Sequence, residues 1–122
     1  MIFIYGGSWQ GKLDFAKAQY GLEDGEIQIC DEATEALDAG ARCLAYVEKW
    51  ALNRVRAGVD PLEAFRVRHD AIVIATDISC GVVPVDATLR AWREASGRLS
   101  AQIAARSEAV WRLFCGLPER LK

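Results

Sequence analysis

The sequence predicts an α/β fold in which helices cover both faces of a mainly parallel sheet of about four strands. Apolar runs at residues 2–5, 71–75 and 109–115 are typical of buried strands, and segments of helical periodicity lie between them. A glycine-rich turn at residues 6–13 (GGSWQGKL) joins the first strand to the first helix. Because strands that alternate with helices build a doubly wound sheet, we expect one domain over residues 1–122.

Local patterns predict the next elements. Residues 14–20 predict a helix that ends at Gly21, since glycine readily adopts the left-handed conformation of a helix C-terminus. Asp24-Gly25 predicts a turn. The alternation of apolar and polar residues over 26–30 then predicts a second strand.

The middle of the chain predicts helices. Residues 34–38 predict a helical turn and residues 41–57 a full helix. The apolar residues that recur there at helical spacing are Leu44, Val47, Ala51 and Val55. The side chains expected to face solvent are Arg42, Glu48, Lys49, Arg54 and Arg56. Asp60 is expected to cap a short helix that continues to Arg68, with Pro61 in its first turn.

The C-terminal third predicts a strand, a long helix and a last strand. The strand at 71–75 is apolar at every position, so both of its faces should be buried. A loop and a helix at 86–107 follow it; the apolar stripe of that helix contains Leu89, Trp92, Leu99 and Ile103. We expect the strand at 109–115 to end before Gly116 and Pro118.

The composition is that of a globular protein with a substantial core, since 52% of the 122 residues are apolar and the net charge is −2. The basic residues are spread along the predicted helices, so we expect no nucleic-acid binding. No apolar run is long enough to span a membrane and the first strand begins at Ile2, so we predict a cytoplasmic protein without a signal peptide or a membrane partner. The four cysteines are far apart and indicate neither zinc nor disulfides; we expect Cys30 and Cys115 to be buried thiols.

The glycine-rich turn predicts a phosphate-binding loop. A strand, then Gly-x-x-x-x-Gly-Lys, then a helix is the arrangement in which backbone N–H groups surround a phosphate. The candidate nucleotide-binding residues are Gly6, Gly7, Ser8, Gln10, Gly11, Lys12 and Leu13. Lys12 would place its charge at the terminal phosphates and is the first candidate catalytic residue. The fold class is therefore specified further as a three-layer sandwich like that of P-loop NTPases.

Two features of this loop leave alternatives open. Leu13 stands where the motif carries a Ser or Thr whose hydroxyl helps to hold magnesium. As an alternative to phosphate binding, Gly6, Gly7 and Gly11 would form only a tight strand-to-helix turn, and Lys12 would be solvated. Trp9 would either stack on a base or fill the pocket and block it.

Other candidate site residues lie at strand ends and on the last helix. Asp31 and Asp77 follow predicted strands on the side of the loop, where each would either hold Mg²⁺ or cap its own turn; Asp77 is the second candidate catalytic residue. Arg93 and Arg98 would reach a phosphate or a neighbouring subunit, or form surface pairs. His69, the single histidine, precedes a strand at the opposite end of the sheet and is expected to be structural or solvated.

Four segments resemble the adenosylcobinamide kinase/adenosylcobinamide-phosphate guanylyltransferase family. Residues 76–84 (TDISCGVVP) are similar to its Asn-Glu-x-Gly-x-Gly-x-Val-Pro segment, and residues 92–101 (WREASGRLSA) to its Phe-Arg-Asp-x-x-Gly-x-x-Asn-Gln helix. Residues 108–116 resemble its last strand, and residues 6–12 its Gly-Gly-x-x-x-Gly-Lys loop. The resemblance covers the first 20 residues and the C-terminal half, whereas the middle does not align.

The resemblance implies phosphoryl transfer from ATP or GTP, with Mg²⁺, to the aminopropanol hydroxyl of adenosylcobinamide, a step of cobalamin biosynthesis. It also implies oligomeric subunits. Bifunctional members transfer guanylyl through a histidine in a segment after the second strand that this chain lacks. His69 cannot take that role, so guanylyl transfer is not expected. Leu13, and Ser100-Ala101 in place of Asn-Gln, depart from the family pattern.

Three hypotheses follow. The chain is an active phosphotransferase of this type, or a relative that binds nucleotide or corrinoid without catalysis. Alternatively, it is a structural partner, as a homo-oligomer or in association with a full-length family member.

Overall fold

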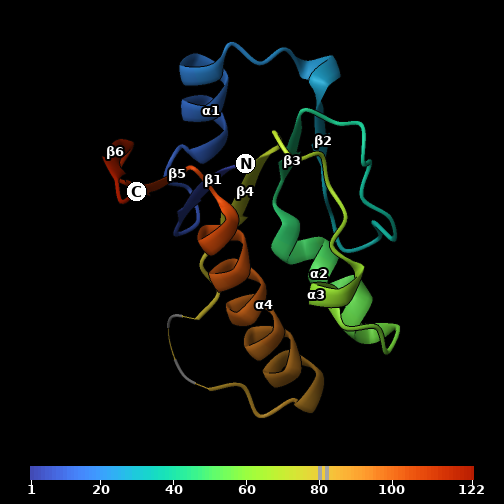
Figure 1. Cartoon of the computed structure of the whole chain (residues 1–122). Coiled ribbons are helices and arrows are strands. Elements are labelled where there is room, and N and C mark those ends of the chain that lie inside the picture. The colour runs from blue at the N-terminus through green and yellow to red at the C-terminus, as the bar shows by residue number, and fades with distance from the viewer. Residues whose placement is uncertain (80, 82) are drawn as a thin grey trace.

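The sheet has six strands. The computed structural model describes residues 1–79, 81 and 83–122, and over these the strand order is β2-β3-β4-β1-β5-β6 (Figure 1). The strands are β1 (Ile2–Gly6), β2 (Ile27–Ile29), β3 (Cys43–Ala45), β4 (Ile72–Thr76), β5 (Ala109–Phe114) and β6 (Leu117–Arg120). All neighbours pair in parallel except β5 and β6, which are antiparallel. The α/β class and the mainly parallel sheet are therefore confirmed.

Four α-helices and a 3₁₀ turn connect the strands over the described residues. They are α1 (Lys12–Tyr20), the 3₁₀ turn η1 (Asp24–Glu26), α2 (Val47–Arg56), α3 (Pro61–Ala64) and α4 (Ala87–Arg106). Gly21 ends α1 with φ of 63°, as the sequence predicted. Asp86 caps α4 by accepting a hydrogen bond from the Leu89 N–H at 3.0 Å. None of these helices is both long and apolar enough to cross a membrane.

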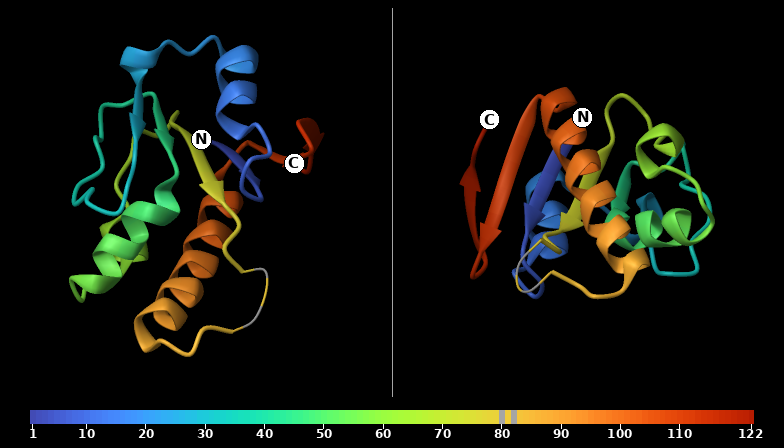
Figure 2. Two further views of the ribbon diagram at one scale, coloured as in Figure 1. Left: turned by 180° about the vertical axis from the view of Figure 1, so that it is seen from behind. Right: turned by 90° about the horizontal axis from the view of Figure 1, so that it is seen from below.

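The sheet separates two apolar cores, because successive side chains of a strand point to opposite faces. Phe3, Leu44 and Val73 belong to the core under α2, α3 and α4, which lie together on one face (Figure 2). Ile4 and Ile74 belong to the core on the other face, under α1. The strand at 71–75 is buried throughout, as its apolar sequence predicted.

The predicted helix at 41–57 is wrong in its first part, which forms β3. Leu44 lies in this strand, and Cys43 to Ala45 are buried between β2 and β4. Tyr46 then turns the chain with φ of 62°, and α2 begins at Val47. The spacing of three residues between Leu44 and Val47 fits a helix, but a short apolar run also fits a buried strand. Periodicity alone therefore did not distinguish a helix from a strand here.

Two other predictions about helices are also wrong. Residues 34–38 form no helix, because the Gln28 side chain bonds the backbone of Ala36 and Asp38 and holds them in irregular structure. The helix capped by Asp60 ends at Ala64, since the buried Phe65 is extended.

The count of four strands is also wrong, because β6 forms in addition to β3. Cys115 and Gly116 have φ of 51° and 75° and make a two-residue hairpin between β5 and β6. Pro118 does not prevent pairing because β6 is an edge strand. Cys115 lies in this turn and is exposed, so its predicted burial is wrong, whereas Cys30 is buried as expected.

Candidate functional site

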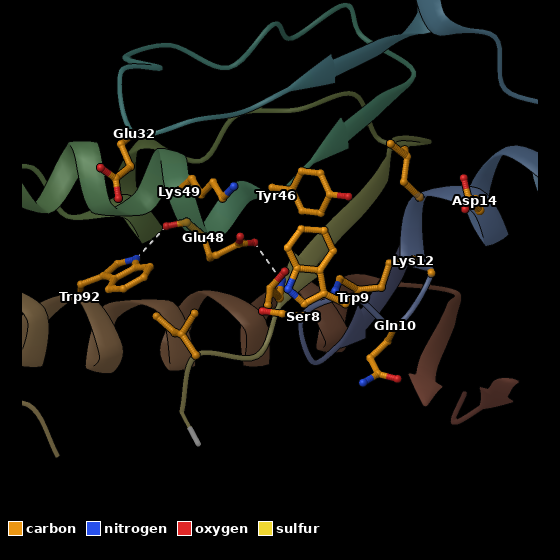
Figure 3. Close-up of a pocket in the computed structure, with 14 residues that line it drawn as sticks. Ser8, Trp9, Gln10, Lys12, Asp14, Glu32, Tyr46, Glu48, Lys49 and Trp92 are labelled. Carbon is orange, nitrogen blue, oxygen red and sulfur yellow. Dashed lines mark hydrogen bonds between the residues drawn. The ribbon is translucent and has the colours of Figure 1, made fainter. Parts of the chain in front are cut away.

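A pocket of about 760 Å³ opens at the carboxyl end of the parallel sheet. The loop after β1, the first turn of α2 and the end of β4 border it (Figure 3). Lys12 begins α1, and Glu48 is the second residue of α2, so the N-termini of two helices face the same hollow. Helix N-termini attract anions, and the carboxyl ends of parallel strands are where ligands bind in such sheets.

Backbone contacts hold the glycine-rich loop to the neighbouring strands. The Asp77 N–H donates to the Gly6 carbonyl at 2.8 Å, which ties the end of β4 to the end of β1. A Cβ atom on Gly6 would lie 2.5 Å from the Leu113 carbonyl oxygen, so only glycine fits between β1 and β5. Gly11 has φ of 81°. The Gln10 side chain accepts a hydrogen bond from the Cys115 N–H, which joins the loop to the β5–β6 hairpin.

Lys12 is a buried lysine at the base of this loop. Its residue surface is 4% exposed, and its Nζ atom donates to the Gly7 carbonyl at 2.6 Å. Burial lowers the pKa of its ammonium group from the ordinary value, and attraction to Glu48 partly opposes that shift. The alternative of a solvated Lys12 is therefore excluded, because the side chain lies inside the pocket wall.

Glu48 is a buried carboxylate that the sequence placed on the solvent face of a helix. It is 5% exposed and borders the same pocket as Lys12. Its Oε1 atom accepts the Thr76 N–H at 2.8 Å, and its own carbonyl accepts the Trp92 Nε1–H at 2.7 Å (Figure 3). Burial raises the pKa of this carboxyl group, while the Thr76 hydrogen bond and Lys12 act in the opposite direction.

The register of α2 is the reason for this error. The sequence-based helix began at residue 41, whereas α2 begins at Val47, so Glu48 falls in the first turn, directly after β3. Had β3 been recognised, a charged residue just after a short buried strand would have pointed to the site. Tyr46 and Lys49 flank Glu48, and the Lys49 Nζ atom lies 5.4 Å from the centre of the Tyr46 ring.

The two predicted magnesium ligands lie in turns. The Asp77 carboxylate accepts from the Ser79 N–H at 2.8 Å and from the Ser79 hydroxyl at 2.5 Å. Asp77 lies between Thr76 and Ile78, which both border the pocket. Asp31 is exposed, and its Oδ1 atom accepts from the Ala33 N–H at 2.8 Å. Both carboxylates thus cap turns, which was the alternative role; a magnesium role for either stays a prediction.

The two candidate arginines of α4, Arg93 and Arg98, are engaged by the chain itself. Arg93 donates to the Ser79 carbonyl and so holds the loop after β4 against the helix. Arg98 pairs with Asp60 at 3.7 Å and with Glu94 at 3.9 Å. His69 is exposed at the amino end of β4, and its carbonyl accepts from the N-terminal ammonium group at 2.8 Å. It therefore lies at the end of the sheet opposite the pocket.

Trp9 and Leu13 border the pocket in different ways. Trp9 is 99% exposed with φ of 60°, so its ring stands at the rim and does not fill the hollow. Leu13 lines the pocket and also packs against the core under α1. The residue that replaces the expected hydroxyl thus contributes to the apolar core.

The donor atoms of the pocket suit a magnesium ion that is shared with a ligand. Within the described ranges, no group of three His, Cys, Asp or Glu side chains could hold a metal by itself. Three acids border the pocket, Asp14, Glu32 and Glu48, and of these Glu48 is the buried one (Figure 3). Magnesium is commonly held by one or two carboxylates together with substrate phosphates and water, so this set fits Mg²⁺ that arrives with a nucleotide.

Comparison with known families assigns most of the chain. Residues 32–121 match the family model described as cobinamide kinase / cobinamide phosphate guanyltransferase. The match includes the middle of the chain, which the sequence motifs alone did not align, and it begins after the Gly6–Leu13 loop. The interpretation of that loop therefore rests on its own sequence and geometry. No curated protein matches the chain.

Proposed function

The chain belongs to the cobinamide kinase / cobinamide phosphate guanyltransferase family, and on that premise we propose that it binds ATP or GTP with Mg²⁺ around Lys12. The terminal phosphoryl group is transferred to the aminopropanol hydroxyl of adenosylcobinamide, in cobalamin biosynthesis. In this proposal the fold is a three-layer sandwich of the P-loop NTPase kind, and residues 6–13 bind the phosphates. Asp77 and Asp31, which the sequence suggested as magnesium ligands, accept hydrogen bonds within their own turns.

The burial of Lys12 beside a helix N-terminus is the observation that carries the proposal. A lysine loses hydration when it is buried, and nothing about packing requires an ammonium group in the wall of a pocket. Bound triphosphate would restore the lost interactions, because its oxygens accept from Nζ and from backbone N–H groups of the loop. Phosphoryl transfer depends mainly on such positioning and neutralisation of charge.

Isothermal titration with ATP and GTP, with and without Mg²⁺, tests nucleotide binding. We expect the unmodified protein to bind, and Lys12→Ala to weaken binding by about tenfold or more, since a charge-assisted contact contributes roughly 1.5–3 kcal/mol. Lys17→Ala is the matched control: Lys17 lies on the same helix, but its Nζ pairs with Asp24 at 2.7 Å, away from the pocket. An equal effect of both substitutions, or no binding by the unmodified protein, contradicts the proposal.

Guanylyl transfer is not part of this proposal. The family route needs a histidine that forms a covalent intermediate, and the chain's one histidine, His69, lies at the opposite end of the sheet. We therefore expect no radiolabel from [α-³²P]GTP to remain on the denatured protein. A label on His69 or on any other residue contradicts this.

A relative that binds without catalysis is the second candidate, and Leu13 favours it. The apolar side chain supplies no oxygen to a metal at the position where the motif has one. Association with another copy or with a full-length family member belongs to this candidate. Measuring ADP release with adenosylcobinamide, in the same samples that bind nucleotide, separates the two: binding without turnover supports the second.

A further inference from the structure

The Glu48 carboxylate is the buried acid of the pocket, and it lies outside the phosphate-loop motif. Its burial is costly, because a carboxylate loses its hydration inside protein. It also stands in a pocket that is suited to anions through Lys12 and two helix N-termini, so bound phosphates would repel it. A carboxylate and a triphosphate can share one pocket when a cation lies between them.

We propose that Glu48 is the protein's ligand for the magnesium ion of the bound nucleotide, in place of the hydroxyl that residue 13 lacks. This inference rests on the proposed nucleotide binding. Glu48 does not belong to the phosphate-loop motif, and it is neither Asp31 nor Asp77, the two magnesium ligands that the sequence suggested.

The hydrogen bonds of Glu48 hold it in place and leave acceptor capacity. Oε1 takes one bond, from the Thr76 N–H at 2.8 Å, and an ionised carboxylate has about four acceptor sites in total. The Trp92 indole holds the backbone of the same residue at 2.7 Å. A ligand fixed on both sides in this way is preorganised, since little side-chain freedom is lost when the ion binds.

Glu48 is also better placed than the other candidates. Asp77 directs its carboxylate to the N–H and hydroxyl of Ser79 in its own turn. Asp31 is exposed in a turn outside the pocket. Glu32 borders the pocket, but its side chain is 64% exposed and pairs with Arg56. Asp14 also borders the pocket but is exposed, so Glu48 is the buried acid among these candidates (Figure 3).

The test compares ATP affinity in Mg²⁺ with ATP affinity in EDTA, by isothermal titration. We expect Mg²⁺ to tighten binding to the unmodified protein, and Glu48→Gln to reduce this gain about tenfold or more. In EDTA the same variant should bind ATP as well as the unmodified protein or better, because a negative charge near the phosphates is gone. Glutamine still accepts the Thr76 N–H, so the fold should be kept; circular dichroism checks this.

Three further variants make the result specific. Asp77→Asn and Glu32→Gln should keep the magnesium gain, and Glu48→Asp should keep part of it. Mn²⁺ electron paramagnetic resonance in the presence of ATP gives a second readout: the protein-induced change of the Mn²⁺–ATP spectrum should disappear with Glu48→Gln and persist with Glu32→Gln.

Other outcomes overturn the inference. If Glu48→Gln weakens ATP binding equally in Mg²⁺ and in EDTA, Glu48 has a structural role only. If Asp77→Asn abolishes the tightening of ATP binding by Mg²⁺ and Glu48→Gln does not, Asp77 is the metal ligand. If the unmodified protein binds no ATP in either condition, the proposed function itself fails, and this is seen before any substitution is made.

Discussion

Lys12 and Glu48 are the two residues at which charge and burial conflict in this protein. Each is about as buried as the apolar core, and each is hydrogen-bonded to a backbone group: Lys12 donates to the Gly7 carbonyl, and Glu48 accepts from the Thr76 N–H. Burial shifts both pKa values toward the neutral forms, and their mutual attraction opposes both shifts. Residues kept in such positions reduce stability and are typical of binding sites.

Glu48→Gln should therefore stabilise the protein at neutral pH. Because the folded-state pKa of Glu48 lies above its ordinary value of 4.5, the glutamate contributes favourably only at acid pH, and this contribution is lost as the pH rises through the folded-state pKa. Urea denaturation should show the variant to be more stable at neutral pH. The difference should shrink as the pH falls toward the ordinary value. A difference that is the same at all pH values would show that packing, not charge, is responsible.

At the scale of elements, the site depends on how closely β1 approaches its neighbours. Gly6 is the last residue of β1 and pairs with Thr76 of β4 and Leu113 of β5. This pairing fixes the position of the glycine-rich loop that follows β1. The glycine is thus required by sheet packing as well as by the turn that the sequence indicated.

Gly6→Ala should lower both stability and nucleotide affinity. The added methyl group would meet the Leu113 carbonyl at 2.5 Å, and backbone cannot move aside at low cost, so we expect a loss of about 1–3 kcal/mol in the free energy of unfolding. Gly25→Ala is the control, since no atom lies within 4 Å of a Cβ there. Urea denaturation and ATP titration measure the two effects. Equal stability of both variants would contradict the argument.

At the scale of the whole molecule, the pocket and the core under α1 share one residue. Leu13 faces both, so the binding surface is continuous with the apolar packing on that face of the sheet. Among the described residues, those around the pocket come from five separate parts of the chain: residues 8–14, Glu32, residues 46–49, residues 76–78 and Trp92 on α4. A bound ligand would connect them and stabilise the fold by linkage.

Leu13→Ser should lower the stability of the protein and strengthen metal binding. Loss of a half-buried leucine is expected to cost about 1–3 kcal/mol, and the new hydroxyl should increase the tightening of ATP binding by Mg²⁺. Thermal denaturation of the free protein and titration in Mg²⁺ and EDTA measure these effects. Leu13→Ala is the control: it should lose stability without any gain in magnesium dependence. Identical behaviour of the two variants would show that no metal lies near residue 13.

The sequence was sufficient where local chemistry decides structure. The buried strand at 71–75, the end of α1 at Gly21 and the cap of α3 at Asp60 follow from apolar runs, glycine conformation and side-chain hydrogen bonding. The family was also recognised from short motifs, and the match over residues 32–121 confirms it. The loop sequence gave the position of the pocket, although what binds there stays a prediction.

Only the tertiary structure decided the start of α2 and the surroundings of Glu48. Three apolar residues at 43–45 suit a helix as well as a strand, and pairing with β2 and β4 selects the strand. The helix then begins later, and its first turn rotates a glutamate from the expected solvent face into the pocket. The sequence thus determined which residue types were available and most of the elements. Long-range strand pairing fixed which charges were buried together, because burial depends on neighbours that lie far apart in the chain.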